Sequence, residues 1–219
     1  MTELEKKLLL TKDEYEYLLE VFERYYPLNK DQPEKQINYY FDTDDLEMTR
    51  KNITCRVRFK NGIYEGTMKQ HFPETDRSTE KTIELYLDLE RNEFTDMGLS
   101  LFGYMETERR IVMETSGCTV VLDKNKYLDT VDYELEIEYN LENEIDAYTI
   151  FQGVVSEIMR RRWLKEYREM YIQSKLTKSK SSRFFDRYCI EKQSHASESA
   201  ANSSKNIDPD AYLKNYTAR

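Results

Sequence analysis

Two stretches of this chain carry charged side chains at every second position, and they constrain the fold more than any other feature. One is the segment 3–7, Glu-Leu-Glu-Lys-Lys, and the other is 133–138, Tyr-Glu-Leu-Glu-Ile-Glu. Because alternate side chains of an extended strand point to the same face, each segment would carry a charged row on one face. An ordinary apolar core does not accept such a row. The rows consist of Glu3, Glu5 and Lys7 in the first segment and Glu134, Glu136 and Glu138 in the second.

The two charged strands are the first and the last of a predicted series. An antiparallel sheet of this size commonly closes on itself to remove its edges, and closure would make its first and last strands neighbours. Their carboxylates would then line one wet interior. A divalent cation such as Mg²⁺ finds oxygen ligands there and keeps waters and substrate phosphates in its other positions. From the residues alone, exposed acidic strands on a solvated sheet face explain the same alternation equally well.

Periodicity and turn signals predict the other elements. The segment 11–14, Thr-Lys-Asp-Glu, is a capping box that starts a helix, and the dipeptide 61–62, Asn-Gly, is a tight hairpin signal. The predicted fold class is α+β, an eight-stranded antiparallel β-barrel with helices packed outside it. The expected strands are 3–10, 36–43, 53–60, 63–69, 80–88, 106–115, 118–123 and 130–139, and the expected helices are 12–26, 89–104, 143–162 with a continuation to 171, and 181–191.

Length and composition predict one domain with a tail. The chain has 219 residues, which is enough to bury a large core. From residue 193 onward the composition shifts to Ser, Ala, Asn, Asp and Lys, as in disordered segments. We therefore expect one domain at 1–190, including the C-terminal helices, and a polar, flexible tail at 191–219.

Charge and cysteine usage exclude several classes of function. The net charge is −9, whereas a general nucleic-acid-binding surface needs a basic footprint. No stretch has the length of a membrane-spanning helix, and the first residues lack the apolar segment of a signal peptide. The three cysteines lie far apart in the sequence, as expected of reduced thiols in a cytoplasmic protein. The two histidines, His71 and His195, fall in predicted loop or tail segments without a partner, so neither is expected to act as a catalytic base.

Basic residues recur on neighbouring strands. Arg56 and Arg58 share one face of their strand, Lys69 follows across the hairpin, and Arg109 or Arg110 adds charge from the sixth strand. Arginine suits phosphate because its planar guanidinium donates two parallel hydrogen bonds. Converging from several strands, these side chains would bind a polyanion. For any single one of them, a solvated cross-strand pair with an acid is an equal alternative.

The order of these residues resembles that of the CYTH, or triphosphate tunnel metalloenzyme, family over about residues 1–190. The family begins with a Glu-x-Glu-x-Lys strand, as in 3–7 here. The segment 178–185, Lys-Ser-Lys-Ser-Ser-Arg-Phe-Phe, and the strand from Asp132 are similar to an uncharacterised bacterial branch found in Firmicutes. The further matches are Tyr40-Phe-Asp-Thr43, Arg56 and Arg58, Lys69, Glu80 and Glu84, Thr107 and Arg109, Asp123, and Glu136 and Glu138.

The resemblance implies roles for individual side chains in a polar tunnel. Mg²⁺ or Mn²⁺ would be held by Glu5, Glu136 and Glu138, with Glu3 nearby. Glu80 and Glu84 would position a second metal or the attacking water. Family members often carry a third alternating acid between these two, but this chain has Thr82 there, which puts a second metal in doubt. Triphosphate oxygens would be neutralised by Lys7, Arg56, Arg58, Lys69 and Arg109, with Lys180 closing one end.

The family includes thiamine triphosphatases, inorganic triphosphatases, RNA triphosphatases and class IV adenylate cyclases. The resemblance therefore implies a metal-dependent hydrolase that releases the terminal phosphate of tripolyphosphate, thiamine triphosphate or a nucleoside triphosphate. Two alternatives stay open. One is a class IV-type adenylate cyclase, and the other is a non-catalytic protein that binds polyphosphate or a nucleoside triphosphate.

Overall fold

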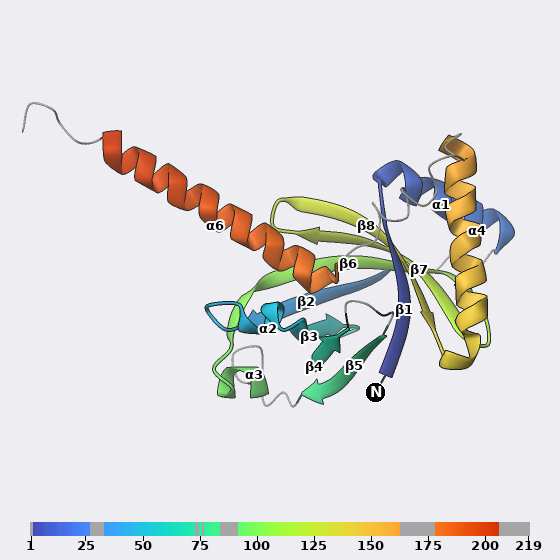
Figure 1. Cartoon of the computed structure of the whole chain (residues 1–219), viewed down its shortest axis with the longest axis horizontal. Helices are drawn as coiled ribbons and strands as arrows, with labels where there is room; N and C mark the ends of the chain where they lie inside the picture. The colour runs from blue at the N-terminus through green and yellow to red at the C-terminus, as the bar shows by residue number, and fades with distance from the viewer. Residues whose placement is uncertain are drawn as a thin grey trace, which may run out of the picture.

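The computed structural model describes residues 2–26, 33–72, 75, 77–83, 92–162 and 178–205. These residues form a closed antiparallel barrel whose strands follow one another in the order β1-β5-β4-β3-β2-β6-β7-β8 (Figure 1). This confirms the predicted fold class. The strands are β1 (Thr2–Leu10), β2 (Glu34–Asp42), β3 (Ile53–Lys60), β4 (Ile63–His71), β5 (Arg77–Ile83), β6 (Ser100–Glu114), β7 (Cys118–Tyr127) and β8 (Thr130–Tyr139).

The barrel closes where the two charged strands meet. β1 and β8 pair antiparallel, with Glu5 opposite Glu138 and Lys7 opposite Glu136. Opposite residues of a strand pair project to the same face, so both charged rows point into the lumen. The predicted neighbourhood of the first and last strands is therefore confirmed.

The apolar faces of these strands lie outside the barrel, under two helices. α1 (Lys12–Tyr25) begins at the predicted capping box, in which the Glu14 backbone N–H donates to Thr11 Oγ1 at 3.3 Å. α4 (Glu144–Arg162) follows a short 3₁₀ turn, η1 (Leu141–Asn143). Leu135 and Ile137 of β8 are fully buried in the cluster that these helices form with the sheet. Each such side chain contributes about 1.5–3 kcal/mol by leaving water. The main hydrophobic core thus leaves the lumen to polar groups.

The helix predicted at 89–104 is wrong over its second half. Within the described residues 92–104, the helical part is limited to the short α3 (Glu93–Asp96), and β6 already begins at Ser100. The backbone φ of Gly98 is +78°, which ends the helical turn, and the following residues pair with β2. Gly103 lies where Phe184 approaches so closely that a Cβ atom would stand 2.9 Å from its ring. Pairing with β2 and packing against this ring outweigh the weak helical pattern.

α6 (Lys180–Lys205) begins at one end of the barrel and projects away from it (Figure 1). Its first turns pack Phe184 and Phe185 against Tyr40, Met105 and Tyr127. The helix was expected at 181–191 and is longer, so it crosses the boundary expected at residue 190. The division into a domain and a tail stays a prediction, and residues 163–171 of the expected helical continuation lie outside the described residues.

The remaining differences are small. α2 (Glu47–Arg50) is the one helical turn within the polar segment 44–51. β2 and β7 are longer than predicted, and β5 begins three residues earlier, at Arg77. Residues 84–88 of the predicted fifth strand lie outside the described residues.

Candidate functional site: the barrel lumen

The lumen contains a cavity of about 580 Å³, which we call the tunnel chamber. All eight strands and α6 contribute to its lining. Among the described residues that line it, seven are basic and four are acidic, an excess of three positive charges in a chain whose net charge is −9. The chamber brings together every predicted site residue except Glu3 and Glu84. The eleven charged residues of the lining are the predicted Lys7, Arg56, Arg58, Lys69, Arg109, Lys180, Glu5, Glu80, Glu136 and Glu138, together with Lys60.

Two predicted residues cannot be placed in the chamber. Glu3 lies on β1, where its backbone pairs with Ser78 of β5, but its side chain is outside the described part of the structure. Glu84 follows the end of β5 and lies outside the described residues. Their roles stay predictions.

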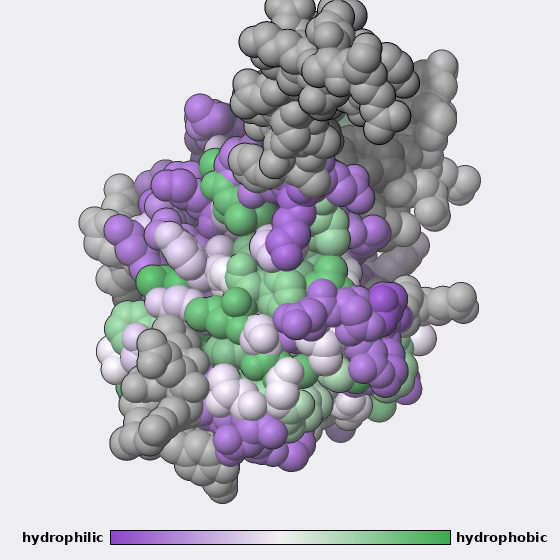
Figure 2. Space-filling view, turned by 90° about the vertical axis from the view of Figure 1, so that its left-hand side faces the viewer, coloured by the Kyte–Doolittle hydropathy of each residue, from purple (hydrophilic) through white to green (hydrophobic). Residues whose placement is uncertain are grey.

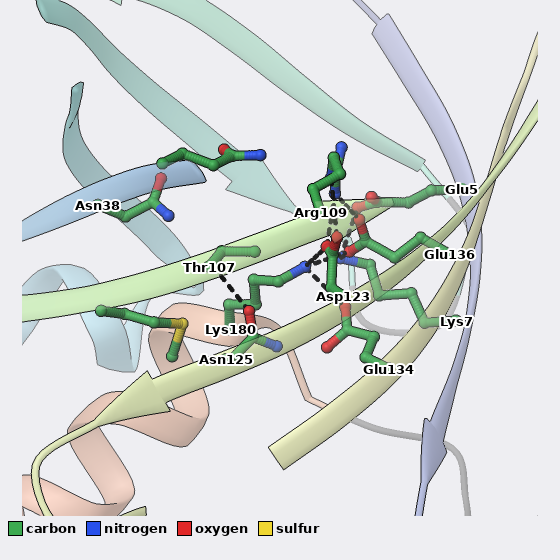
Figure 3. Close-up of polar contacts among 12 residues, drawn as sticks. Glu5, Lys7, Asn38, Thr107, Arg109, Asp123, Asn125, Glu134, Glu136 and Lys180 are labelled. Atoms are coloured by element: carbon green, nitrogen blue, oxygen red, sulfur yellow. Dashed lines mark hydrogen bonds and ion pairs between the residues drawn. The ribbon is translucent and has the colours of Figure 1, made fainter. Parts of the chain in front are cut away.

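Glu136 is the centre of a buried ion-pair network (Figure 3). Its Oε1 atom is 3.0 Å from Lys7 Nζ and 2.9 Å from Lys180 Nζ, and its Oε2 atom pairs with Arg109 Nη2. Burial by itself would raise the pKa of Glu136. Lys180, Lys7 and Arg109 outweigh burial and hold this pKa well below its ordinary value.

Lys180 reaches this network from the first turn of α6. Its Nζ atom is 2.8 Å from Asp123 Oδ2, 3.0 Å from Glu134 Oε1 and 2.9 Å from Glu136 Oε1. Burial would lower the pKa of Lys180, but the three carboxylates outweigh it and raise this pKa. Arg183, one turn later, pairs with Glu134 and lies 2.9 Å from Asp132. These contacts fix the start of α6 against the lumen.

Glu5 occupies the side of the lumen nearest to β4 and β5. Its Oε1 atom lies 3.1 Å from Lys7 Nζ and 3.2 Å from Lys69 Nζ. Burial would raise the pKa of Glu5, yet the two lysines outweigh it and lower this pKa. Glu5 is therefore an anionic oxygen donor that two ammonium groups already share.

Among the described residues, little negative charge faces Arg56 and Arg58, in contrast to the other basic residues of the chamber. Arg58 Nε donates to the amide oxygen of Asn38 at 3.0 Å. Burial, followed by repulsion from Arg56 and Arg109, lowers the pKa of Arg58 to about 10. Arg56 Nε is buried and has no hydrogen-bond partner among the described residues, and its Nη2 atom is 3.8 Å from Glu80. Two guanidinium groups held in this way suit an anion whose oxygen atoms accept hydrogen bonds from both.

The carboxylates of the lumen fit a hard cation only in part. Within the described residues, no three acidic, histidine or cysteine side chains converge as the ligands of one metal ion. Glu5 and Glu138 lie opposite each other on β1 and β8, and the Glu138 side chain is 47% exposed. Glu136 is engaged by three cations instead. The donor set fits Mg²⁺ or Mn²⁺ bound by one or two carboxylates, with waters and phosphate oxygens in the other positions.

The sequence prediction missed several residues of this site. His71 does not lie in a loop: it ends β4, and its Nε2 atom is 2.9 Å from Thr54 Oγ1. Burial, then Lys69 and Lys7, lowers its pKa to about 4, so the imidazole is neutral near pH 7. The sequence showed Asp123 as a match to the family and Glu134 as part of the acidic row, but it gave neither of them a partner. Both carboxylates accept a hydrogen bond from Lys180 Nζ, and this contact joins residues 46 or more positions apart in the sequence.

A family model described as the CYTH domain matches residues 1–180. The chain belongs to the CYTH family. A curated relative from Bacillus subtilis (strain 168), named "Putative triphosphatase YjbK", is 27% identical over 198 residues, which cover 84% of this chain and 94% of the relative. The family match extends from β1 to the first residue of α6, and therefore includes all the described strands.

Solved structures of similar proteins share the fold. A "putative adenylate cyclase" from Bacillus halodurans is 24% identical, with a TM-score of 0.59 over 84% of this chain and 97% of that one. A structure from Hippeastrum, described as "Putative adenylyl cyclase HpAC1" with "a dominant triphophatase activity", is 15% identical, with a TM-score of 0.55 over 84% of this chain and 95% of that one. Within the described part of this chain, no helix has the length and apolar character needed to cross a membrane.

Proposed function

We propose that this CYTH protein is a metal-dependent triphosphatase that hydrolyses the terminal phosphate of a triphosphate bound in the tunnel chamber. The observation that carries this proposal is the pair Arg56 and Arg58, whose charges are poorly neutralised by the described residues around them, inside a cavity whose described lining has a positive excess. A triphosphate supplies several negative oxygens in a row, and the chamber is large enough for it. The relative named as a triphosphatase supports the same activity.

The basic residues would divide into two groups. Arg56, Arg58 and Lys69 would contact the phosphate oxygens directly. Lys7 would contact them as well while it holds Glu5 and Glu136 in place. Arg109 and Lys180 already pair with three carboxylates each, so their main effect would be to fix the acidic wall. Such fixed charges stabilise a transition state because they need no reorganisation when charge moves.

In the proposed reaction, a water oxygen attacks the terminal phosphorus and the bond to the bridging oxygen breaks. The leaving diphosphate carries away the electron pair of that bond, and the arginines and lysines stabilise the added charge. Glu80 lines the chamber beside Arg56 and would orient the water and take its proton. Glu5 and Glu138, with Glu3, would hold Mg²⁺ or Mn²⁺, which polarises the phosphoryl oxygens when bound.

A direct test is phosphate release from tripolyphosphate, thiamine triphosphate, ATP and GTP, each with Mg²⁺, Mn²⁺ or EDTA. We expect metal-dependent release from at least one of them. Lys69→Met should lower kcat/KM by about a hundredfold or more. The matched control Lys81→Met alters an exposed lysine of the neighbouring strand and should leave kcat/KM within about twofold. Unchanged kinetics in Lys69→Met would contradict the proposal.

The same assay separates the two alternatives. A cyclase would release diphosphate and cyclic AMP from ATP, whereas the triphosphatase releases orthophosphate and a diphosphate. A non-catalytic binding protein would bind tripolyphosphate without releasing phosphate over several hours. We also propose that the protein acts in the cytoplasm, and the free thiols of Cys55, Cys118 and Cys189 support this proposal.

A further inference from the structure

A second cavity of about 670 Å³ adjoins the tunnel chamber, and we call it the side chamber. It lies between the start of β3, the end of β4 and the beginning of α6. The two cavities share six lining residues: Glu5, Lys7, Thr54, His71, Ser179 and Ser181. A molecule bound across this junction would therefore lie partly in each chamber.

The two chambers differ in charge. Among the described residues, the lining that belongs to the side chamber alone contains three charged side chains. Lys178 pairs with Asp186 at 2.8 Å, which leaves Arg77 as the uncompensated charge of this described lining. The described lining that belongs to the tunnel chamber alone adds nine charged residues to the shared pair, of which six, including Arg56 and Arg58, are basic and three are acidic. A chain of phosphates is therefore bound better in the tunnel chamber, while the side chamber suits a group of low charge.

The side chamber is lined by an aromatic ring, an aliphatic side chain and uncharged polar groups. Phe72 exposes 43% of its surface and offers a ring face for stacking, and Ile53 adds apolar surface. Asn52, Thr49 and Ser182 place amide and hydroxyl groups around them. A volume of this size is typical of sites for drug-sized molecules.

The junction between the chambers is neutral and rich in hydrogen-bonding groups. Thr54 Oγ1 lies 2.9 Å from His71 Nε2 and 2.5 Å from Ser181 Oγ. The charged pair at this point, Glu5 and Lys7, is internally compensated at 3.1 Å. Hydroxyl groups and an uncharged imidazole suit the ester oxygen and neighbouring hydroxyls of an organic group, where the phosphate chain ends.

We infer that the substrate is a triphosphate ester, with its phosphate chain in the tunnel chamber and its organic group in the side chamber. This inference rests on the proposed function and names the substrate class of that site. Inorganic tripolyphosphate fills the tunnel chamber alone and gains nothing from the side chamber. Substitutions in the side chamber therefore discriminate between the two kinds of substrate.

The test compares kcat/KM for ATP, GTP, thiamine triphosphate and tripolyphosphate among three variants. Ser182→Phe fills the side chamber, Phe72→Ala removes its exposed ring, and Ser116→Phe places the same bulk in the lining of the tunnel chamber alone. We expect Ser182→Phe and Phe72→Ala to lower kcat/KM for the preferred ester by about tenfold, because a stacked or enclosed organic group is lost. Tripolyphosphate hydrolysis should stay within about twofold in both.

Several outcomes would overturn the inference. It fails if wild-type protein cleaves tripolyphosphate but none of the esters, although the proposed function then stands. It also fails if Ser182→Phe affects both kinds of substrate equally, as a product exit or water channel would require, or if only Ser116→Phe discriminates. Should wild-type protein cleave none of the four, the proposed function fails, and calorimetric titration with ATP and tripolyphosphate decides the inference. Weaker binding of ATP alone in Ser182→Phe then supports it, and equal binding refutes it.

Discussion

Replacing Lys180 by methionine should destabilise the protein strongly. Its Nζ atom contacts carboxylates of Asp123, Glu134 and Glu136, whose side chains are 0%, 0% and 4% exposed. Methionine keeps most of the side-chain volume and removes the charge. The variant would thus leave buried acids without the ammonium group that all three share. Breaking a buried ion pair by removing one partner costs about 3–5 kcal/mol of the free energy of unfolding.

The loss should depend on pH. Burial already raises the pKa of Glu134 above its ordinary value, and removing Lys180 raises it further. A carboxyl whose pKa is higher in the folded than in the unfolded state binds more protons when folded, so it gains stability as the pH falls. The difference between Lys180→Met and wild type should therefore shrink as the pH falls from 7 toward 5.

Urea denaturation followed by circular dichroism at pH 7 and pH 5 measures both effects. Lys178→Met is the matched control, because Lys178 makes an ion pair with Asp186 in which the side chains are 67% and 53% exposed. Such a surface pair is worth about 0–1 kcal/mol. The account is refuted if Lys180→Met loses no more stability than Lys178→Met at pH 7, or if its loss grows at pH 5.

Three further predictions concern other groups. The pKa of His71 is about 4, below its ordinary 6.5, so between these pH values the unfolded chain binds a proton that the folded chain does not. The free energy of unfolding should therefore fall as the pH falls from 6.5 to 4. His71→Gln should remove that part of the pH dependence of urea unfolding. Glu5→Gln should raise the Mn²⁺ concentration for half-maximal phosphate release by about tenfold or more, and an unchanged value would remove Glu5 from the metal site. Burial raises the pKa of Cys55 to about 12, and Cys118 is also buried. Of the three cysteines, only Cys189 should therefore react rapidly with a thiol reagent in the native protein. Mass spectrometry of the modified peptides measures this reactivity.

The barrel could be predicted from the sequence because its alternation is unusually clear. β3 and β8 have the predicted bounds, since Asn61-Gly62 and the acidic row leave few other registers. The segment 89–104 could not be predicted, because its conformation depends on pairing with β2 and on the approach of Phe184 to Gly103. Both are contacts between distant parts of the chain.

The candidate site was predicted as a set of residues but not as a set of partners. Inward strand positions follow from the two-residue period, so Arg56, Arg58 and Lys69 were identified. The sequence did not predict which carboxylates neutralise the basic residues. Among the described residues, carboxylates largely neutralise Arg109 and Lys180 but not Arg56 and Arg58. This difference depends on distances across the lumen.

The most direct test of the central claim is the kcat/KM of Arg58→Gln for metal-dependent phosphate release, measured beside Arg50→Gln. Arg50 is exposed on α2 and pairs with Asp45, so its replacement controls for the loss of one positive charge. We predict that Arg58→Gln loses about a hundredfold or more because one transition-state contact disappears, while Arg50→Gln stays near wild type. Equal kcat/KM values for the two folded variants would contradict the assignment of the lumen as the triphosphate site.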